Sequence, residues 1–212
     1  QADALRAAPS ARGLPQTLAD IRELIVQWSN LQGLRSHKYV CGFCGNIVAS
    51  SQGYYTGDSE GGHQGFIYIC PHCGGPSFML GPKQVPGVAP GNKVDHLPAD
   101  IAALYNEARQ AVSVNAFTAA VLACRKLLMN IAVNHGAKEG ATFVSYVEHL
   151  ANAGFVPPNG RAWVDHIRSK GNEATHEIRL MSSDEATELI SFAEMLLKFI
   201  YEFPSKIPSA KP

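Results

Sequence analysis

The chain has 212 residues, 46% of them hydrophobic, and its 18 basic and 18 acidic side chains cancel to a formal net charge of zero. A balanced charge excludes a global positive field that would attract nucleic acid, so any nucleic-acid site has to be local. No apolar run approaches the roughly 20 residues that span a bilayer, and this length suits one large domain or two small ones. We expect a cytoplasmic protein with two domains and no membrane partner.

The first part of the chain is predicted to be a tail followed by a helix. Residues 1–14 are alanine-rich and irregular, which indicates disorder. From Leu18 onward apolar residues recur at helical spacing, at Ile21, Leu24, Ile25 and Trp28. This pattern predicts an amphipathic helix within residues 15–34 that packs on later helices.

Two Cys-x-x-Cys pairs are the strongest motif in the chain. Cys41 and Cys44 form the first pair, Cys70 and Cys73 form the second, and 25 residues lie between the pairs. The spacing is typical of structural zinc sites, in which each short loop presents two thiolates to one tetrahedral ion. Iron is the alternative, because four thiolates also hold iron. We predict zinc, since closed four-thiolate sites are usually structural zinc sites.

The residues around these pairs have the composition of a small β structure. Three short β-rich runs flank the cysteines, at residues 46–49, 66–69 and 77–80. They predict a three-stranded zinc ribbon over residues 35–80 that depends on its metal for most of its stability. Four aromatic residues either fill the core of the ribbon or form a surface for bases or a protein partner: Tyr54, Tyr55, Phe66 and Tyr68.

The rest of the chain is predicted to be helical. Prolines and glycines crowd residues 81–96, so we expect a linker there. Residues 97–204 then show apolar residues at helical spacing in five segments separated by short breaks. Ser182 and Glu185 have the spacing of a capping box before the last segment. We predict a five-helix bundle with a frayed tail over residues 205–212, and therefore a mainly α chain with the ribbon as a small β subdomain.

Three residues stand out within the predicted bundle. Glu107 and Arg125 lie beside apolar stripes on the two longest helices, and we expect a partly buried ion pair between them. Cys124 lies within an apolar helical run, which favours a small buried core residue over a reactive thiol.

A polar stripe is predicted near the end of the bundle. Arg168, Asn172 and His176 are four residues apart, so a continuous helix would place them on one side. A histidine can move a proton near neutral pH, an arginine can neutralise a phosphorane, and an asparagine can orient either group. These are the requirements for cutting RNA without a metal. The alternative is that Gly171 breaks the helix, which would make Asn172 a turn residue and His176 a cap.

Several segments carry a resemblance to a known family: residues 97–98, 107–109, 125–128, 167–168, 171–172, 176–177 and 199–202. Over residues 95–204 the chain resembles the bacterial domain-of-unknown-function family numbered 4145, and the Gly-Asn-x-x-x-His element is the most specific match. A zinc ribbon ahead of this domain is similar to the arrangement in some members. The family is grouped with the HEPN superfamily (higher eukaryote and prokaryote nucleotide-binding), so the resemblance implies an HEPN-like helical bundle that forms homodimers.

The resemblance also implies two functions. Many HEPN members are metal-independent endoribonucleases in toxin and phage-defence systems, and others bind nucleotides or partners. Their motif places an arginine directly before the asparagine, whereas here Gly171 precedes Asn172 and the candidate arginine is Arg168. We therefore predict an accessory or sensor in bacterial defence or nucleic-acid processing, which binds RNA, a nucleotide or a protein partner. The alternative is an endoribonuclease that uses His176 with Arg168 and Asn172.

Overall fold

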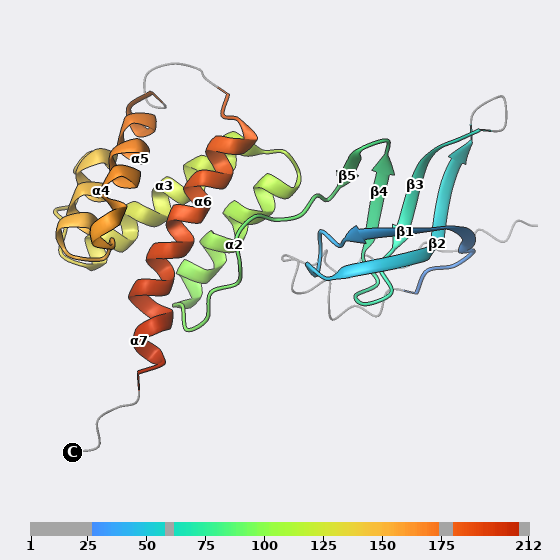
Figure 1. Cartoon of the computed structure of the whole chain (residues 1–212), viewed down its shortest axis with the longest axis horizontal. Coiled ribbons are helices and arrows are strands. Elements are labelled where there is room, and N and C mark those ends of the chain that lie inside the picture. Colours follow the sequence, from blue (N-terminus) through green and yellow to red (C-terminus); the bar gives the residue numbers. More distant parts are fainter. Residues whose placement is uncertain (1–26, 58–61, 174–179, 208–212) are drawn as a thin grey trace, which may run out of the picture.

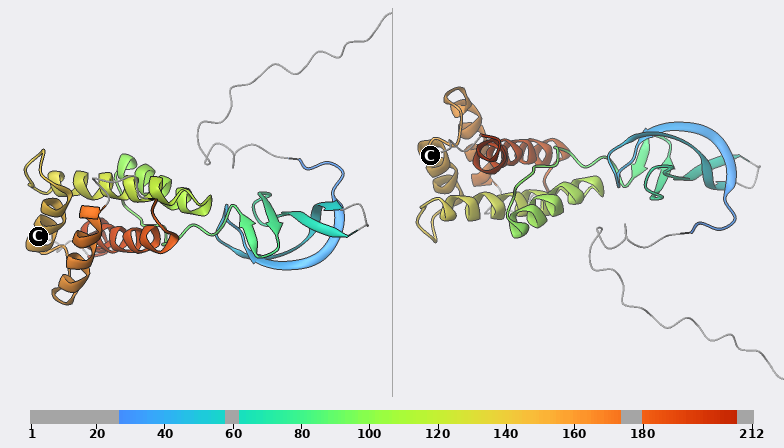
Figure 2. Two further views of the ribbon diagram at one scale, coloured as in Figure 1. Left: turned by 90° about the horizontal axis from the view of Figure 1, so that it is seen from above. Right: turned by 90° about the horizontal axis from the view of Figure 1, so that it is seen from below.

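The structure is a computed structural model that describes residues 27–57, 62–173 and 180–207. These residues form a five-stranded antiparallel sheet followed by a helical bundle (Figure 1). Views from above and below show the sheet and the bundle lying end to end, joined by a single connection (Figure 2). The fold is therefore mixed, and the prediction of a mainly α chain with a three-stranded β subdomain was wrong.

The sheet has two more strands than predicted, one at each edge. The strands pair in chain order as β1 Gln32–Val40, β2 Ile47–Gly57, β3 His63–Ile69, β4 Pro76–Leu80 and β5 Lys83–Val85. The three predicted runs lie in β2, β3 and β4. β1 is polar and begins inside the predicted N-terminal helix, and β5 has three residues inside the predicted linker. Both escaped detection because an edge strand can be short, polar and bounded by proline.

One face of the sheet packs a small core. Its buried members are Tyr39, Cys41, Val48, Tyr68, Cys70 and Met79, and Phe66 packs against them. Of the four aromatic residues with two interpretations, Tyr68 thus belongs to the core and Phe66 borders it, whereas Tyr55 is 43% exposed. Tyr54 lies on the opposite face, because neighbouring residues of a strand point to opposite sides.

The bundle contains five helices of ten residues or more in the described part of the chain. They are α2 Ala99–Ser113, α3 Phe117–Asn134, α4 Phe143–Asn152, α5 Arg161–Glu173 and α6 Ser183–Leu197. The last helix continues through a π-helical turn, Lys198–Glu202, into α7 Phe203–Ser205, and a short 3-10 turn, Pro158–Gly160, precedes α5. All five were predicted from their apolar periodicity, which is a strong signal in a helix with one buried stripe.

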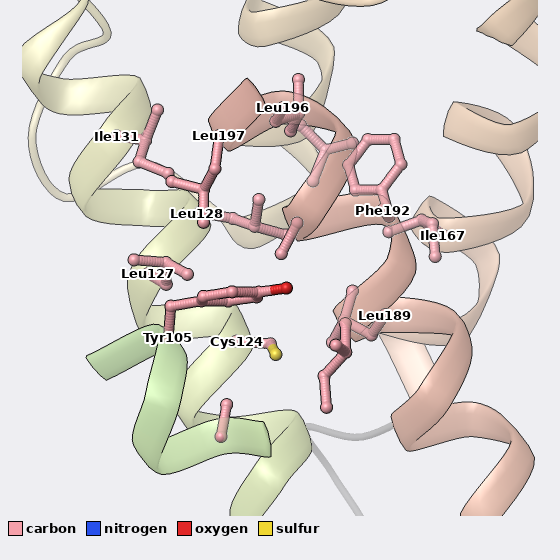
Figure 3. Packing of buried hydrophobic residues seen from close by; sticks show 14 of the residues in the cluster. Tyr105, Cys124, Leu127, Leu128, Ile131, Ile167, Leu189, Phe192, Leu196 and Leu197 are labelled. Carbon is pink, nitrogen blue, oxygen red and sulfur yellow. The ribbon is translucent and has the colours of Figure 1, made fainter. Parts of the chain in front are cut away.

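The core of the bundle is apolar and closely packed (Figure 3). Tyr105 of α2 lies among leucines of α3 and α6, and the Cys124 thiol is buried beside it. Burial raises the pKa of Cys124 to about 12, so the thiol is neutral at physiological pH. The interpretation of Cys124 as a small core residue is confirmed. α3 is long and apolar enough to cross a membrane by length and composition, but its apolar face lies in this core.

The connection between β5 and α2 is held against the bundle by polar contacts. Glu194 of α6 accepts hydrogen bonds from the Asn92 backbone N–H at 2.9 Å and from the Asn92 side-chain amide at 3.0 Å. Arg109 of α2 donates to the carbonyl oxygens of Pro90 and Gly91, both at 2.8 Å. Gly91 has a φ of +70°, and a Cβ there would lie 2.8 Å from the Tyr105 hydroxyl, so only glycine fits.

Candidate metal centre

Two equivalent turns carry the four cysteines. The first turn joins β1 to β2 and the second joins β3 to β4. In the first, the Gly45 N–H donates to the Cys41 carbonyl at 2.8 Å, and in the second the Gly74 N–H donates to the Cys70 carbonyl at 2.9 Å. Both glycines have a φ of 72°, a conformation that strains a residue with a Cβ. Each Cys-x-x-Cys-Gly segment therefore folds into the same tight turn.

The four sulfur atoms converge on one point. The Cys41 and Cys73 Sγ atoms are 3.7 Å apart, the Cys44 and Cys70 Sγ atoms are 3.9 Å apart, and all four lie within 4.8 Å of one another. A tetrahedral ion with metal–sulfur bonds of about 2.3 Å requires sulfur–sulfur separations of about 3.8 Å. The four cysteines are thus positioned to hold one metal ion, as predicted.

The surroundings of the thiols explain why this cluster needs a cation. Burial raises the pKa of Cys41 and of Cys73, because a thiolate is poorly solvated there. Burial also opposes ionisation of Cys70, but hydrogen bonds from the backbone N–H groups of Cys73 and His72 and from the Cys73 and Cys41 thiols together outweigh it, and the pKa of Cys70 is lowered. Four thiolates at these separations repel one another, so complete ionisation requires a divalent charge between them. Such an ion would be fully coordinated by sulfur, and its role would be structural.

Residues distant in sequence hold the two turns in place. Trp28 donates its indole N–H to the Gly74 carbonyl at 2.8 Å. Gln84 donates from its amide to the Val40 carbonyl at 2.8 Å and to the Pro86 carbonyl at 3.0 Å. These contacts could not be read from the cysteine motif. Trp28 was expected on a helix that packs against the bundle, and it instead borders the second turn; the rest of that predicted apolar stripe lies outside the described residues.

The predicted polar stripe is only partly described. α5 continues through Gly171 to Glu173, so Arg168 and Asn172 lie one turn apart on the same helix. The alternative interpretation, a helix break at Gly171, is not what the structure shows. His176 lies outside the described residues, and convergence of the three residues remains a prediction.

A small pocket lies between α3, α4, α5 and α6. It measures about 30 Å³ and is bordered by Arg125, Phe143, Glu185 and Glu188 among others. So small a volume does not admit a nucleotide. The Arg125 guanidinium lies 4.5 Å from the centre of the Phe143 ring, and burial lowers its pKa. Glu107, its expected ion-pair partner, is exposed on α2.

Comparison with known proteins identifies the helical part of the chain. A family model described as Domain of unknown function (DUF4145) matches residues 106–211, half of the chain. The match begins within α2 and leaves out the sheet with its four cysteines. No curated protein and no solved structure gives a significant match. The chain belongs to the DUF4145 family.

Proposed function

We propose that this chain is a zinc-stabilised binding module that recognises nucleic acid with its five-stranded sheet, β1 to β5, which we call the ribbon. The observation that carries the proposal is a set of three exposed cationic side chains on the strands of the sheet. Arg35, Lys38 and Lys83 lie in β1 and β5 with exposed side chains, whereas the acidic residues of this region, Asp58 and Glu60, fall outside the described residues. A local basic surface on a neutral chain is what a confined nucleic-acid site requires.

The metal supports this surface without taking part in recognition. A four-thiolate zinc site has a formal charge of about −2, which the amides of the two turns partly neutralise. The ion has no open position for a ligand, so the binding surface has to lie elsewhere on the ribbon. A protein partner is the competing ligand, and the three exposed cationic side chains of β1 and β5 favour a polyanion over it.

A role as an accessory or sensor in bacterial defence or nucleic-acid processing belongs to the same proposal. It rests on the family and on the HEPN-like character that the sequence resemblance implies. In that role the ribbon binds the nucleic acid, and the bundle holds the ribbon in place or passes the binding signal to a partner. A cytoplasmic location fits both parts.

Binding to a labelled oligonucleotide by the full chain tests the proposal. The double variant Lys38→Glu/Lys83→Glu should weaken binding at least tenfold at low salt, and affinity should fall steeply as salt is added because phosphate contacts release counterions. The matched control is Lys126→Glu/Lys138→Glu, which makes the same charge change at two exposed lysines of the bundle. Equal losses in both double variants would place the site outside the ribbon.

The identity and role of the metal are tested by elemental analysis. Wild-type protein should contain one zinc per chain, and Cys41→Ser should lose it together with the stability of the ribbon. Cys124→Ser is the control, because that thiol is buried in the other core. Iron in place of zinc, or full metal content in Cys41→Ser, would contradict the assignment.

An endoribonuclease is the second candidate, favoured by the continuity of α5 through Gly171. In this version Arg168 and Asn172 bind and orient a phosphate, and His176 moves the proton. Transfer RNA incubated with the protein without free divalent metal should stay intact if the chain only binds. Cleavage by the parent that disappears in His176→Ala would establish the nuclease instead.

A further inference from the structure

The sheet face opposite the ribbon core carries a row of partly buried apolar side chains. Tyr54 of β2 pairs with Ile67 of β3, Ile67 pairs with Phe78 of β4, and Phe78 pairs with Val85 of β5. Directly paired residues point to the same face, so these four side chains lie side by side. The Trp28 ring extends the row at the Tyr54 end, with ring centres 6.3 Å apart and planes tilted by 59°. We call these five residues the outer row.

The outer row does not stabilise the ribbon in the way its core does. Ile67 lies between Phe66 and Tyr68 in sequence, and those two side chains point to the core face. None of the five side chains belongs to either hydrophobic cluster of the described structure, and all five are partly exposed. A continuous apolar strip that no other described element covers is a candidate binding surface.

The chemistry around the outer row selects the ligand. Lys83 is exposed two residues before Val85 on β5, so its side chain points to the same face. The described strands provide aromatic rings and a neighbouring cation, and no carboxylate lies among their residues. Such a surface suits a chain that is anionic along its backbone and has flat apolar faces. Single-stranded nucleic acid has both properties, whereas a duplex hides the faces of its bases.

The dimensions agree with a short single strand. Four neighbouring strands span three spacings of about 4.8 Å, or about 14 Å in all. Stacked nucleotides repeat at about 3.4 Å along a strand, so this width matches about four nucleotides. Four-stranded sheets that stack bases on exposed aromatic side chains are a known mode of RNA recognition.

We propose that the outer row binds about four nucleotides of single-stranded nucleic acid by stacking, with Lys83 beside the phosphates. This inference rests on the proposed function and names its ligand class and contact residues. Trp28 and Tyr54 provide the stacking surface, and Val85 marks the other end of the row.

The experiment uses the full chain with Trp163→Phe, which leaves Trp28 as the single fluorophore because the chain has two tryptophans. The probe is an oligothymidylate of about twelve nucleotides, compared with the same strand in a duplex. We expect quenching of Trp28 by the single strand and weaker binding of the duplex. Tyr54→Ala should weaken single-strand binding about tenfold, because stacking on one aromatic ring contributes about 1–3 kcal/mol per base. Tyr55→Ala is the control, since it removes the same side chain from the next residue on the opposite face.

Two further variants separate binding from folding. Tyr54→Phe keeps the ring and removes the hydroxyl, which donates to the Ser29 carbonyl, and it should bind normally. Val85→Glu places a carboxylate at the β5 end of the row and should weaken binding at least tenfold with metal content unchanged. Equal binding of single strand and duplex, with no effect of Tyr54→Ala or Val85→Glu, would overturn the inference while leaving nucleic-acid recognition by the ribbon intact. Failure to bind either probe would overturn both, leaving a protein partner as the ligand.

Discussion

At the residue scale, the Glu194 carboxylate joins the connecting segment to the bundle. It is only 8% exposed and accepts two hydrogen bonds from Asn92 and one from Lys198. Burial alone would raise the pKa of Glu194, but the Lys198 ammonium and the Asn92 donors outweigh burial and hold the pKa below its ordinary value of 4.5. The ionised form is therefore the one that the fold stabilises.

Glu194→Gln should destabilise the bundle by about 1–3 kcal/mol at pH 7, because it removes charge-assisted hydrogen bonds and turns an amide donor toward Asn92. A group with a lowered folded pKa contributes stability above its unfolded pKa and loses it as the pH falls through the folded value. The difference between wild type and variant, measured by urea denaturation, should thus shrink below about pH 4.5. Glu107→Gln, at an exposed position on α2, is the control, and an equal loss in both variants would refute the role of Glu194.

The cysteine cluster and the Glu194 carboxylate differ in how far the sequence could predict them. Cys41 and Cys70 each have a cysteine partner three residues later, so the motif itself shows the ligand set. Glu194 has its partner 102 residues away, and its position on an otherwise apolar helix gives no local signal. Trp28 is similar, because its apolar spacing fitted a helix and only the fold reveals its contact with Gly74.

At the scale of elements, the start of α6 agrees with its sequence signal. The Ser182 hydroxyl accepts a hydrogen bond from the Glu185 N–H, and the Glu185 carboxylate accepts one from the Ser182 N–H at 2.9 Å. The predicted capping box is confirmed. A cap is a local arrangement of four residues, so its pattern survives whatever tertiary packing follows.

Ser182→Ala should cost about 0.5–2 kcal/mol of bundle stability, since it leaves an N-terminal amide of α6 without its side-chain acceptor. Ser183→Ala is the matched control: it changes the next serine, which is exposed and makes no capping bond. Thermal unfolding followed by helical circular dichroism measures both. A smaller effect at residue 182 than at residue 183 would show that the box does not hold the helix end.

Unlike the cap of α6, the strands could be predicted from their sequence only in part. β2, β3 and β4 are bounded by the cysteine turns and contain β-branched and aromatic residues, so their runs could be recognised. β1 reads as a polar segment and β5 as part of a proline-rich linker, because an edge strand owes its formation to its neighbour rather than to its own composition. The fold class was missed for this reason.

At the scale of the whole molecule, homodimer formation remains a proposal with a candidate surface. Phe199 and Phe203 are each 43% exposed, and their rings pack edge to face with ring centres 5.3 Å apart. Together with Met195 they border a groove. Sedimentation should show a concentration-dependent dimer that Phe199→Glu dissociates. Leu122→Glu, at an exposed apolar position of α3, should leave it intact. A wild-type protein that stays monomeric at high concentration would end the proposal.

The residues that the structure describes form two hydrophobic clusters that share no residue, one in the sheet and one in the bundle. The backbone link between them includes a hydrogen bond from the Gly87 N–H to the Ser113 carbonyl at 2.7 Å, at the end of α2. The sheet cluster contains Cys41 and Cys70, whereas the bundle cluster contains no proposed metal ligand. Stability of the two parts should therefore respond differently to loss of the metal.

Chelation should unfold the sheet and leave the bundle helical. The free energy that the metal supplies is confined to the cluster whose side chains it orders, and the larger bundle core buries enough apolar surface to stand alone. After incubation with a strong chelator, Trp28 emission should shift to that of an exposed indole, while the helical signal and the melting temperature of the bundle change by only a few degrees. Trp163, which packs edge-on against Phe192 in the bundle, is the internal control. A single cooperative loss of both signals on metal removal would mean that the two cores fold as one unit and that the metal stabilises the whole chain.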